Sequence, residues 1–366
     1  MVRFLLTLAV AVCTPVALAQ IVHLSPTGRD TNDGLTEARP VATLQRALDV
    51  ALRVRRQGPD VLVQVAPGRY VGQAAVTGAR TDGARIRISG NKGDVGGRPE
   101  FIGDRERTLT WLTMKSAVGK PTRMVISGLR IREYRTAISL EGNRDRADAF
   151  NAGNTIRNNF FEHIGSLPGA GKNISTAAIR LVNSKDNLIE NNRFETIRNA
   201  EGCSALHAIY AAHFSSGNII RGNRFSDLCG SVIKLRDRSN GNLIEGNIFT
   251  RLDSVPAVEE WYCDKSARKD CTKKLGECPS TGNRVKDNQL QSADGKLVDV
   301  LGGSERRAWC HVSDFAGERI LVGSARPAAG VELPAAPDHG SRPLERGRPL
   351  LENGIRWPPQ APAWGK

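Results

Sequence analysis

A recurring eight-residue pattern in the middle of the chain constrains the fold more than any other sequence feature. The pattern is Asn-x-Ile-x-x-Asn-x-Phe, and its copies start 33, 31, 24 and 41 residues apart. Self-similarity at this period predicts a solenoid in which each repeat packs only on its neighbours. The copies begin at Asn154, Asn187, Asn218 and Asn242, with a weaker copy at Asn283.

The spacing within the pattern predicts strands. Its Ile and Phe lie an odd number of residues apart with an Asn or Gly bend between them, as in two short strands that meet at a corner with both apolar side chains inward. Helical repeats would show a 3.6-residue period instead. A further strand precedes each copy. We therefore predict an all-β, right-handed parallel β-helix with an Ile core column and hydrogen-bonded Asn ladders. The preceding strands are Ala137–Leu140, Ala178–Leu181, Ala208–Ala211 and Val232–Leu235.

The segment His23–Gly34, followed by Arg39–Leu48, resembles the opening of secreted pectate-lyase-like β-helix proteins of the polysaccharide lyase superfamily. In that family the Pro-x-x-Thr-Leu-x-x-Ala segment begins an amphipathic helix that caps the solenoid. The resemblance covers roughly residues 22–300 and implies a capping helix at about residues 41–56. It does not imply one reaction, because lyases, hydrolases, epimerases and inactive binders share this scaffold. The apolar face of the helix is expected at Leu44, Ala47, Leu48, Ala51 and Leu52.

The N-terminus predicts export. Arg3 precedes the apolar stretch Phe4–Leu18, and Ala17-Leu-Ala19 supplies a small-residue cleavage pattern, so residues 1–19 are expected to be a signal peptide that is too short to span a membrane. The protein is then secreted or periplasmic, with no transmembrane segment. We expect a β-helix domain at residues 20–310 and a C-terminal extension at 311–366, Pro-rich from 327 and extended or disordered.

The net charge predicts anionic partners, and the cysteine content agrees with export. Lys and Arg number 52 against 38 Asp and Glu, a formal net charge of +14 that favours anionic partners. Acidic polysaccharide is the expected partner, and export argues against nucleic acid. Six cysteines remain after Cys13, whose position does not favour lipidation. An even number in an exported chain predicts disulfides, with the pairing left open. The candidates are Cys203, Cys229, Cys263, Cys271, Cys278 and Cys310.

The register of the repeats identifies the outward side chains, because neighbours of an inward Ile point outward. His207 and His213 bracket the strand of Tyr210. A slip by one residue would reverse every assignment. One position after the Ile column stand Ser139, Arg180, Tyr210 and Lys234, and three positions after it stand Glu141, Val182, Ala212 and Arg236.

Unequal loop lengths predict walls beside this face. Extra residues precede the strands of Ile179 and Ile209, and an insertion at 259–282 follows the fourth coil. We expect Cys203 and Cys229 to join within one wall. The other wall would be made rigid by Cys263, Cys271 and Cys278.

A groove lined by Arg, Tyr and Lys suits β-elimination on a uronate-containing polysaccharide. The reaction needs a cation to neutralise the carboxylate, a base, and an acid for the leaving oxygen. Like charges around Lys234 would favour a neutral amine, so Lys234 is the predicted base. Arg180 or Arg236 would clamp the carboxylate. The predicted acid is Tyr210, His207 or His213, and the predicted substrate-binding residues are Ser139, Glu141 and Arg238.

The resemblance implies a Lys or Arg base, in some members with calcium. The clustered Asp site of pectate lyases is not evident in the sequence, so no cofactor is expected and calcium is left open.

Less specific interpretations remain. An outward Lys or Arg is usually a solvated charge, His207 could be a satisfied core histidine, and Asp237 and Arg238 could be turn residues that pair locally.

The first alternative function is a non-catalytic module that binds anionic glycan or the cell envelope. The second is a glycoside hydrolase, which needs two carboxylates facing the bond. We expect Glu259 and Glu260 to open a loop, and the outward columns of the central coils do not supply such a pair.

Overall fold

The computed structural model describes residues 20–54, 60–79, 84–90, 97–107, 109–171, 174–263, 276–291, 295–301, 310 and 317–323. The expected signal peptide, Cys13, Cys271 and the Pro-rich segment from residue 327 lie outside these residues and stay predictions. None of the helices in the described part of the chain has the length and apolar character that a bilayer crossing requires.

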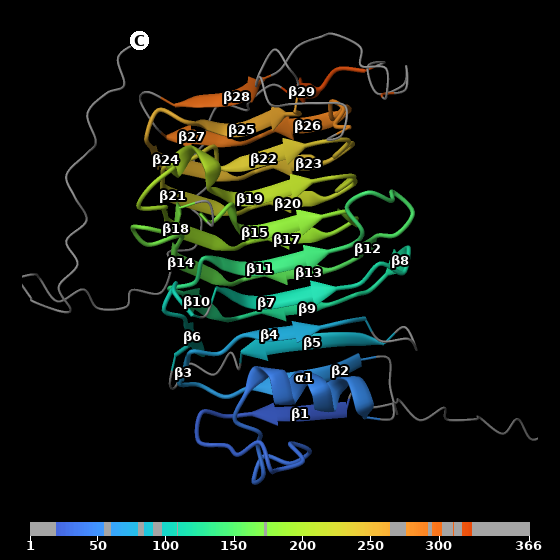
Figure 1. Cartoon of the computed structure of the whole chain (residues 1–366), viewed down its shortest axis with the longest axis vertical. Helices are drawn as coiled ribbons and strands as arrows, with labels where there is room; N and C mark the ends of the chain where they lie inside the picture. Colours follow the sequence, from blue (N-terminus) through green and yellow to red (C-terminus); the bar gives the residue numbers. More distant parts are fainter. Residues whose placement is uncertain are drawn as a thin grey trace, which may run out of the picture.

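The chain forms a parallel β-helix, as predicted. Successive coils stack along one axis, from β1 at the bottom of Figure 1 to β28 and β29 at the top. The strands build three long parallel sheets, which we call A, B and C, and a three-stranded sheet D at the side. A central coil contributes one strand to each long sheet, for example β17, β18 and β19 in chain order.

The sheets have these strands in spatial order. Sheet A contains β1 (Gln20–Leu24), β2 (Asp60–Val65), β5 (Arg85–Gly90), β9 (Val125–Ser127), β13 (Thr155–Arg157), β17 (Leu188–Glu190), β20 (Ile219–Arg221), β23 (Leu243–Glu245), β26 (Asn283–Lys286) and β29 (Ile320–Val322). Sheet B contains β3 (Arg69–Val71), β6 (Glu100–Ile102), β10 (Arg130–Arg132), β14 (Phe160–Ile164), β18 (Arg193–Ile197), β21 (Arg224–Leu228), β24 (Ile248–Leu252) and β27 (Gln289–Gln291).

Sheet C contains β4 (Ala75–Thr77), β7 (Thr110–Lys115), β11 (Thr136–Glu141), β15 (Ala177–Val182), β19 (His207–Ala212), β22 (Ile233–Arg236), β25 (Pro256–Trp261) and β28 (Lys296–Val300). Sheet D contains β8 (Lys120–Pro121), β12 (Asn151–Ala152) and β16 (Ser184–Lys185). A short 3-10 helix, η2 (Cys203–Ala205), precedes β19.

Columns of identical side chains fill the core. The Phe residues of the repeat form one such column in sheet B, and their ring centroids lie 4.9, 4.8 and 5.1 Å apart along it. The Ile columns of sheets A and C are likewise buried: Ile156, Ile189, Ile220 and Ile244 in sheet A, and Ile138, Ile179, Ile209 and Ile233 in sheet C. The Phe column is Phe161, Phe194, Phe225 and Phe249.

Two Asn ladders run along the corners, which confirms the predicted role of the Asn residues. In one of them the side-chain amide of Asn187 donates to the side-chain oxygen of Asn218 at 2.7 Å, and Asn218 donates to Asn242 at 2.9 Å. Each rung therefore satisfies polar atoms that the stacking would otherwise bury unpaired. The second ladder contains Asn159, Asn192, Asn223, Asn247 and Asn288.

The helix α1 (Leu44–Arg53) covers the N-terminal end of the solenoid beside β1 and β2 (Figure 1). The side chain of Thr43 accepts a hydrogen bond from the backbone N–H of Arg46 and caps the helix. Leu44, Leu48 and Ala51 are fully buried against the first coils. The helix thus covers apolar surface that an open coil end would expose.

The chain near Glu259 differs from the sequence expectation. Glu259 and Glu260 do not open a loop, because β25 extends the outward face of sheet C by one coil. Glu260 lies on the inward column beside Leu235 and is fully buried, paired with Arg319. Burial raises the pKa of Glu260 to about 7, against the opposing effect of Arg319.

The Phe column predicts a large loss of stability on truncation. Phe225→Ala removes a ring that stacks on both neighbours, so the free energy of unfolding should fall by about 3–5 kcal/mol. Urea denaturation followed by circular dichroism measures it. The adjacent exposed residue offers a control, Arg224→Ala, expected to change stability by no more than about 0.5 kcal/mol. Equal effects of the two substitutions would contradict the column as a source of stability.

Candidate active site

The outward columns of sheet C have the predicted register. Ser139 aligns with Arg180, Arg180 with Tyr210, and Tyr210 with Lys234. The structure adds Glu259 as the next member of this column. The second column has Arg236 beside Ala212, and Trp261 follows Arg236.

A cavity of about 460 Å³ lies over these columns at β19, β22 and β25. One wall comes from the loops that precede β15 and β19, as the loop lengths predicted. The cavity brings together four of the predicted site residues, His207, Tyr210, Lys234 and Arg236. Its other lining residues are Thr176, Ser204, Ala205, Glu259, Trp261 and Leu301.

Lys234 is paired with a carboxylate. Its Nζ contacts Glu259 Oε1 and lies 5.1 Å from the centre of the Trp261 ring. The predicted environment of like charges is therefore wrong, because Glu259 neutralises the ammonium at contact distance.

Arg236 connects Tyr210 to a buried carboxylate. Its guanidinium donates to both oxygens of Glu277 at 2.8 and 2.6 Å and to the Tyr210 hydroxyl at 2.9 Å. Glu277 is fully buried. Although burial opposes it, the Glu277 hydrogen bonds raise the pKa of Arg236, so this residue stays charged. The guanidinium also lies 4.4 Å over the Trp261 ring.

Burial raises the pKa of the Tyr210 hydroxyl, against the opposing effect of Arg236. The phenol therefore stays protonated at neutral pH. Because the phenol oxygen accepts from Arg236, its own proton is available to a group in the cavity.

His207 is buried and neutral. Its Nδ1 lies 2.7 Å from the backbone oxygen of Ser231 and 2.9 Å from the Ser231 hydroxyl. Burial, together with the charges of Lys234 and Arg236, lowers the pKa of His207 to about 3. His207 is thus well hydrogen-bonded, as the core interpretation expected, but it also lines the cavity beside Tyr210, with ring centroids 5.5 Å apart.

The structure places the other predicted residues outside the cavity lining. Arg180 donates to Ser139 at 3.0 Å and pairs with Glu141, so these three bind one another. His213 Nδ1 lies 2.8 Å from Asp237 Oδ2, and both side chains are buried.

Arg238 pairs with Asp237 at 2.8 Å, as the turn interpretation predicted. It also donates to the backbone oxygen of Gly276 at 3.0 Å and lies over the ring of Phe214. Arg238 is therefore engaged by its neighbour Asp237 and by residues of two other chain segments.

Three buried side chains together have the composition of a metal site. Ligand atoms of His213, Asp237 and Glu277 lie within 4.8 Å of one another. Both carboxylates are already occupied, Glu277 by Arg236 and Asp237 by Arg238. Guanidinium groups in these positions repel a cation, so the donor set does not fit a metal ion as arranged here.

Two disulfides join described residues. Cys203 pairs with Cys229 across Cα atoms 5.5 Å apart, in the wall where they were expected. Cys278 pairs with Cys310 across 5.8 Å. Cys263 is also disulfide-bonded.

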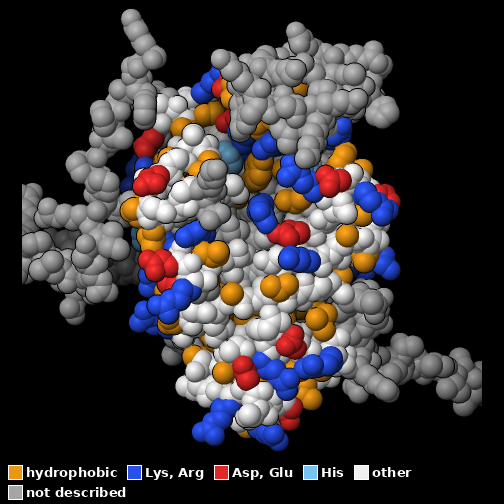
Figure 2. Space-filling model, in the orientation of Figure 1, with side chains coloured by type: hydrophobic (Ala, Val, Ile, Leu, Met, Phe, Trp, Pro, Cys, Tyr) orange, Lys and Arg blue, Asp and Glu red, His pale blue; other side chains and the backbone are white. Residues whose placement is uncertain are grey.

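The site is charge-balanced rather than cationic. Each of Arg180, Lys234 and Arg236 has a carboxylate partner. Basic and acidic side chains are likewise interspersed over the face shown in Figure 2. The net positive charge of the chain thus does not produce an unpaired basic column in sheet C.

Comparison with known proteins places the chain in a family. Residues 118–307, just over half of the chain, match the family described as "Right handed beta helix region". The chain belongs to this family, which confirms the predicted right-handed β-helix. No curated protein matches it.

Several solved structures are similar at low identity. An alginate lyase from Paenibacillus sp. str. FPU-7 is 14% identical, with a TM-score of 0.45 over 70% of this chain and 95% of that chain. Pectate lyase Pel9A is 13% identical, with a TM-score of 0.42 over 79% and 80%. The catalytic domain of a GH87 α-1,3-glucanase is 14% identical, with a TM-score of 0.38 over 80% and 47%.

Sequence reasoning missed Trp261 and Glu277, and it placed Glu259 at the start of a loop rather than in a strand. All three follow the last clear repeat, where the expected insertion hid the strand β25. One signal was present, because Ala257-Val258 matches the Ala-Ile pairs that open the strands at Ala178 and Ala208. Aligning that pair would have placed Glu259 next to Lys234.

The low pKa of His207 predicts a pH dependence of stability. In the unfolded chain a histidine binds a proton below about pH 6.5, whereas folded His207 does so only near pH 3. The unfolded state therefore binds more protons in this window, and the free energy of unfolding falls as the pH decreases. The contribution is about 1.4 kcal/mol per pH unit below pH 6.5.

Urea denaturation from pH 7 to pH 4.5 measures this dependence. His207→Gln should flatten the pH profile, with a difference from the unsubstituted protein that reaches about 3 kcal/mol at the low end. The exposed Arg224 provides a control, Arg224→Ala, which should keep the original profile. Parallel profiles for all three proteins would show that His207 does not titrate as described.

Proposed function

We propose that the protein is an exported polysaccharide lyase that cleaves an acidic, uronate-containing polysaccharide by β-elimination at the sheet C cavity. The observation that carries this proposal is the convergence of a neutral imidazole, a protonated phenol and a lysine ammonium on one cavity of about 460 Å³. These are the three groups that removal of a proton next to a carboxylate, with departure of the C4 oxygen, requires.

The proton acceptor in this proposal is His207 rather than Lys234. The Nζ of Lys234 is already engaged by Glu259 in an ion pair, so in this proposal Lys234 neutralises the uronate carboxylate and does not accept the proton. His207 is neutral, and in the described part of the chain its Nε2 has no hydrogen-bond partner. A bound carboxylate beside the ring would increase the proton affinity of Nε2 in the complex.

The proton donor is Tyr210. When the C5 proton passes to His207 Nε2, its electron pair forms the C4–C5 double bond and the C4–O bond breaks. The Tyr210 hydroxyl gives its proton to the departing oxygen, and Arg236 stabilises the resulting phenolate at 2.9 Å. Proton return from His207 to Tyr210 restores the site. Trp261 lines the cavity and offers an apolar contact for a sugar.

Two observations support export. The two disulfides between described residues are typical of an oxidising compartment, and residues 1–19 have the pattern of a signal peptide. We place the protein outside the cytoplasm, secreted or periplasmic, with residues 20–310 as the β-helix domain and 311–366 as an extension, of which the strand β29 (Ile320–Val322) pairs with β26 in sheet A.

Glycoside hydrolysis is the second candidate, because Glu259 lies on the outward column next to Lys234. The cavity lining contains one carboxylate among the described residues, whereas a hydrolase needs two. A non-catalytic module that binds anionic glycan through the same cavity is the third candidate.

The proposal predicts an unsaturated product. The mature protein should generate the ultraviolet absorbance of a 4,5-unsaturated uronate on at least one member of a panel of polyuronates and acidic glycosaminoglycans. Tyr210→Phe removes only the hydroxyl and should lower kcat by about 10²–10⁴-fold, and Lys234→Ala should reduce kcat/KM similarly. Arg224→Ala, on sheet B, should leave both constants unchanged.

The other results discriminate among the candidates. New reducing ends without ultraviolet absorbance would establish a hydrolase and overturn elimination. Salt-sensitive glycan binding with no cleavage would establish the binding module. Full lyase activity in Tyr210→Phe would remove the hydroxyl from the mechanism.

A further inference from the structure

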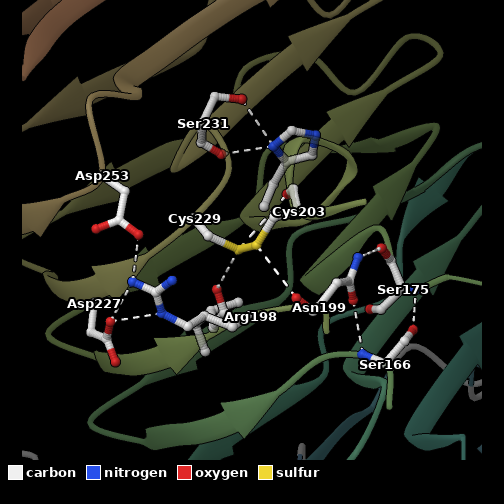
Figure 3. Close-up of a disulfide and its surroundings, with 11 residues drawn as sticks. Ser166, Ser175, Arg198, Asn199, Cys203, Asp227, Cys229, Ser231 and Asp253 are labelled. Atoms are coloured by element: carbon white, nitrogen blue, oxygen red, sulfur yellow. Dashed lines mark hydrogen bonds and ion pairs between the residues drawn. A yellow bond between two sulfur atoms is a disulfide. The ribbon is translucent and has the colours of Figure 1, made fainter. Parts of the chain in front are cut away.

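Two chain segments meet beside His207, and a disulfide joins them. The first runs from Cys203 through the cavity-lining Ser204 and Ala205 into His207. The second runs from Cys229 to Ser231 and leads into β22, which carries Lys234 and Arg236. The Cys203–Cys229 disulfide joins the two segments, as the yellow bond in Figure 3 shows.

Gly230 lets the segments approach more closely than any other residue would. A Cβ atom at this position would lie 2.0 Å from the backbone oxygen of Leu206 and 2.7 Å from that of Cys203. Both obstacles are backbone atoms, which cannot rotate away. The backbone of Gly230 is not left-handed, so the glycine is required for space rather than for conformation.

The approach places Ser231 against the ring of His207. The Ser231 backbone oxygen lies 2.7 Å from His207 Nδ1, and the dashed lines from Ser231 in Figure 3 mark this contact and the one from its hydroxyl. A carbonyl oxygen only accepts hydrogen bonds, so the proton of the neutral ring is assigned to Nδ1. Nε2 then carries a lone pair.

We propose that the backbone carbonyl of Ser231, held in place by the Gly230 contact and the Cys203–Cys229 disulfide, is a positioning group that fixes the tautomer of His207 with Nε2 as acceptor. The importance of this tautomer for catalysis rests on the proposed function, because the opposite tautomer would present an N–H to the substrate and could not take its proton. The tautomer itself follows from the contacts alone.

The disulfide therefore has a local consequence besides its effect on global stability. Its two cysteines lie four residues before His207 and two residues before Ser231. Without the bond, the loop of η2 is held to Ser231 by noncovalent contacts only, and the Nδ1 to carbonyl distance is free to increase. We expect the ring to populate both tautomers in that state.

Nitrogen NMR of the mature protein labelled with ¹⁵N-histidine tests the proposal directly. The signals of His207 are those that disappear in His207→Gln. In the unsubstituted protein they should report a neutral ring protonated at Nδ1 from pH 5 to pH 8. Gly230→Ala should give a mixture of tautomers and a ring that titrates in this range.

Two matched variants isolate the cause. Ser231→Ala removes the hydroxyl and keeps the carbonyl, so the Nδ1-protonated tautomer should persist. Gly78→Ala introduces the same methyl group where the nearest atom is 3.5 Å away, and should leave the spectrum unchanged. If Gly230→Ala does not fold, the double variant Cys203→Ser/Cys229→Ser releases the same contact without inserting an atom into it.

The outcomes separate this proposal from the proposed function. A ring protonated at Nε2 in the unsubstituted protein, or unchanged signals in both Gly230→Ala and the double cysteine variant, would overturn the positioning role. The expected spectra without any unsaturated product would uphold the positioning role and overturn the lyase. If a substrate is cleaved, Gly230→Ala should lower kcat by about 10²-fold with little change in KM.

Discussion

The residue-by-residue register between coils is the constraint on which the rest of the structure depends. A shift of β19 and β22 by one residue would bury Tyr210 and Lys234 and expose Ile209 and Ile233. The Phe column and the two Asn ladders prevent such a shift, because a ring or an amide has its partner only at the matching position of the next coil. The core columns thus hold the outward columns in line, and the cavity is a result of that alignment.

The electrostatic balance of the site shapes what it can bind. Removing charges from water is costly, and pairing each cation with a carboxylate offsets much of that cost. Arg236 and Glu277 illustrate this, since Glu277 is fully buried and accepts two charged hydrogen bonds. The carboxylate partner of Lys234 differs from Glu277, because Glu259 lines the cavity together with Lys234. An anionic ligand has to compete with Glu259 for Lys234, so this pair makes recognition depend on a carboxylate placed at one point rather than on general positive charge.

Most of the fold and part of the site could be predicted from the sequence. The repeat identified the core columns, the Asn ladders and the register of Tyr210, Lys234 and Arg236, because in a solenoid one pattern determines many equivalent positions. Ion-pair partners carry no such pattern. Glu277 reaches Arg236 from the segment after β25, and Glu141 pairs with Arg180 from the preceding coil. The ion pairs of the site join residues from different segments of the chain, so the sequence pattern of a single strand does not predict them.

The cavity over sheet C is lined in part by a loop that departs from the repeat, the one that contains η2. The chain after β19 and β22 places His213, Asp237 and Arg238 in the left-handed region, which is unfavourable for such residues, and Thr196, Asp227 and Arg251 in sheet B adopt the same conformation. The loop before β19 adds a disulfide, and Gly230 admits a backbone contact that no side chain would allow. Local features of this kind persist only when surrounding structure holds them in place. The stacked coils on both sides do so, and a scaffold of otherwise repetitive strands can therefore orient one histidine ring by a single backbone carbonyl.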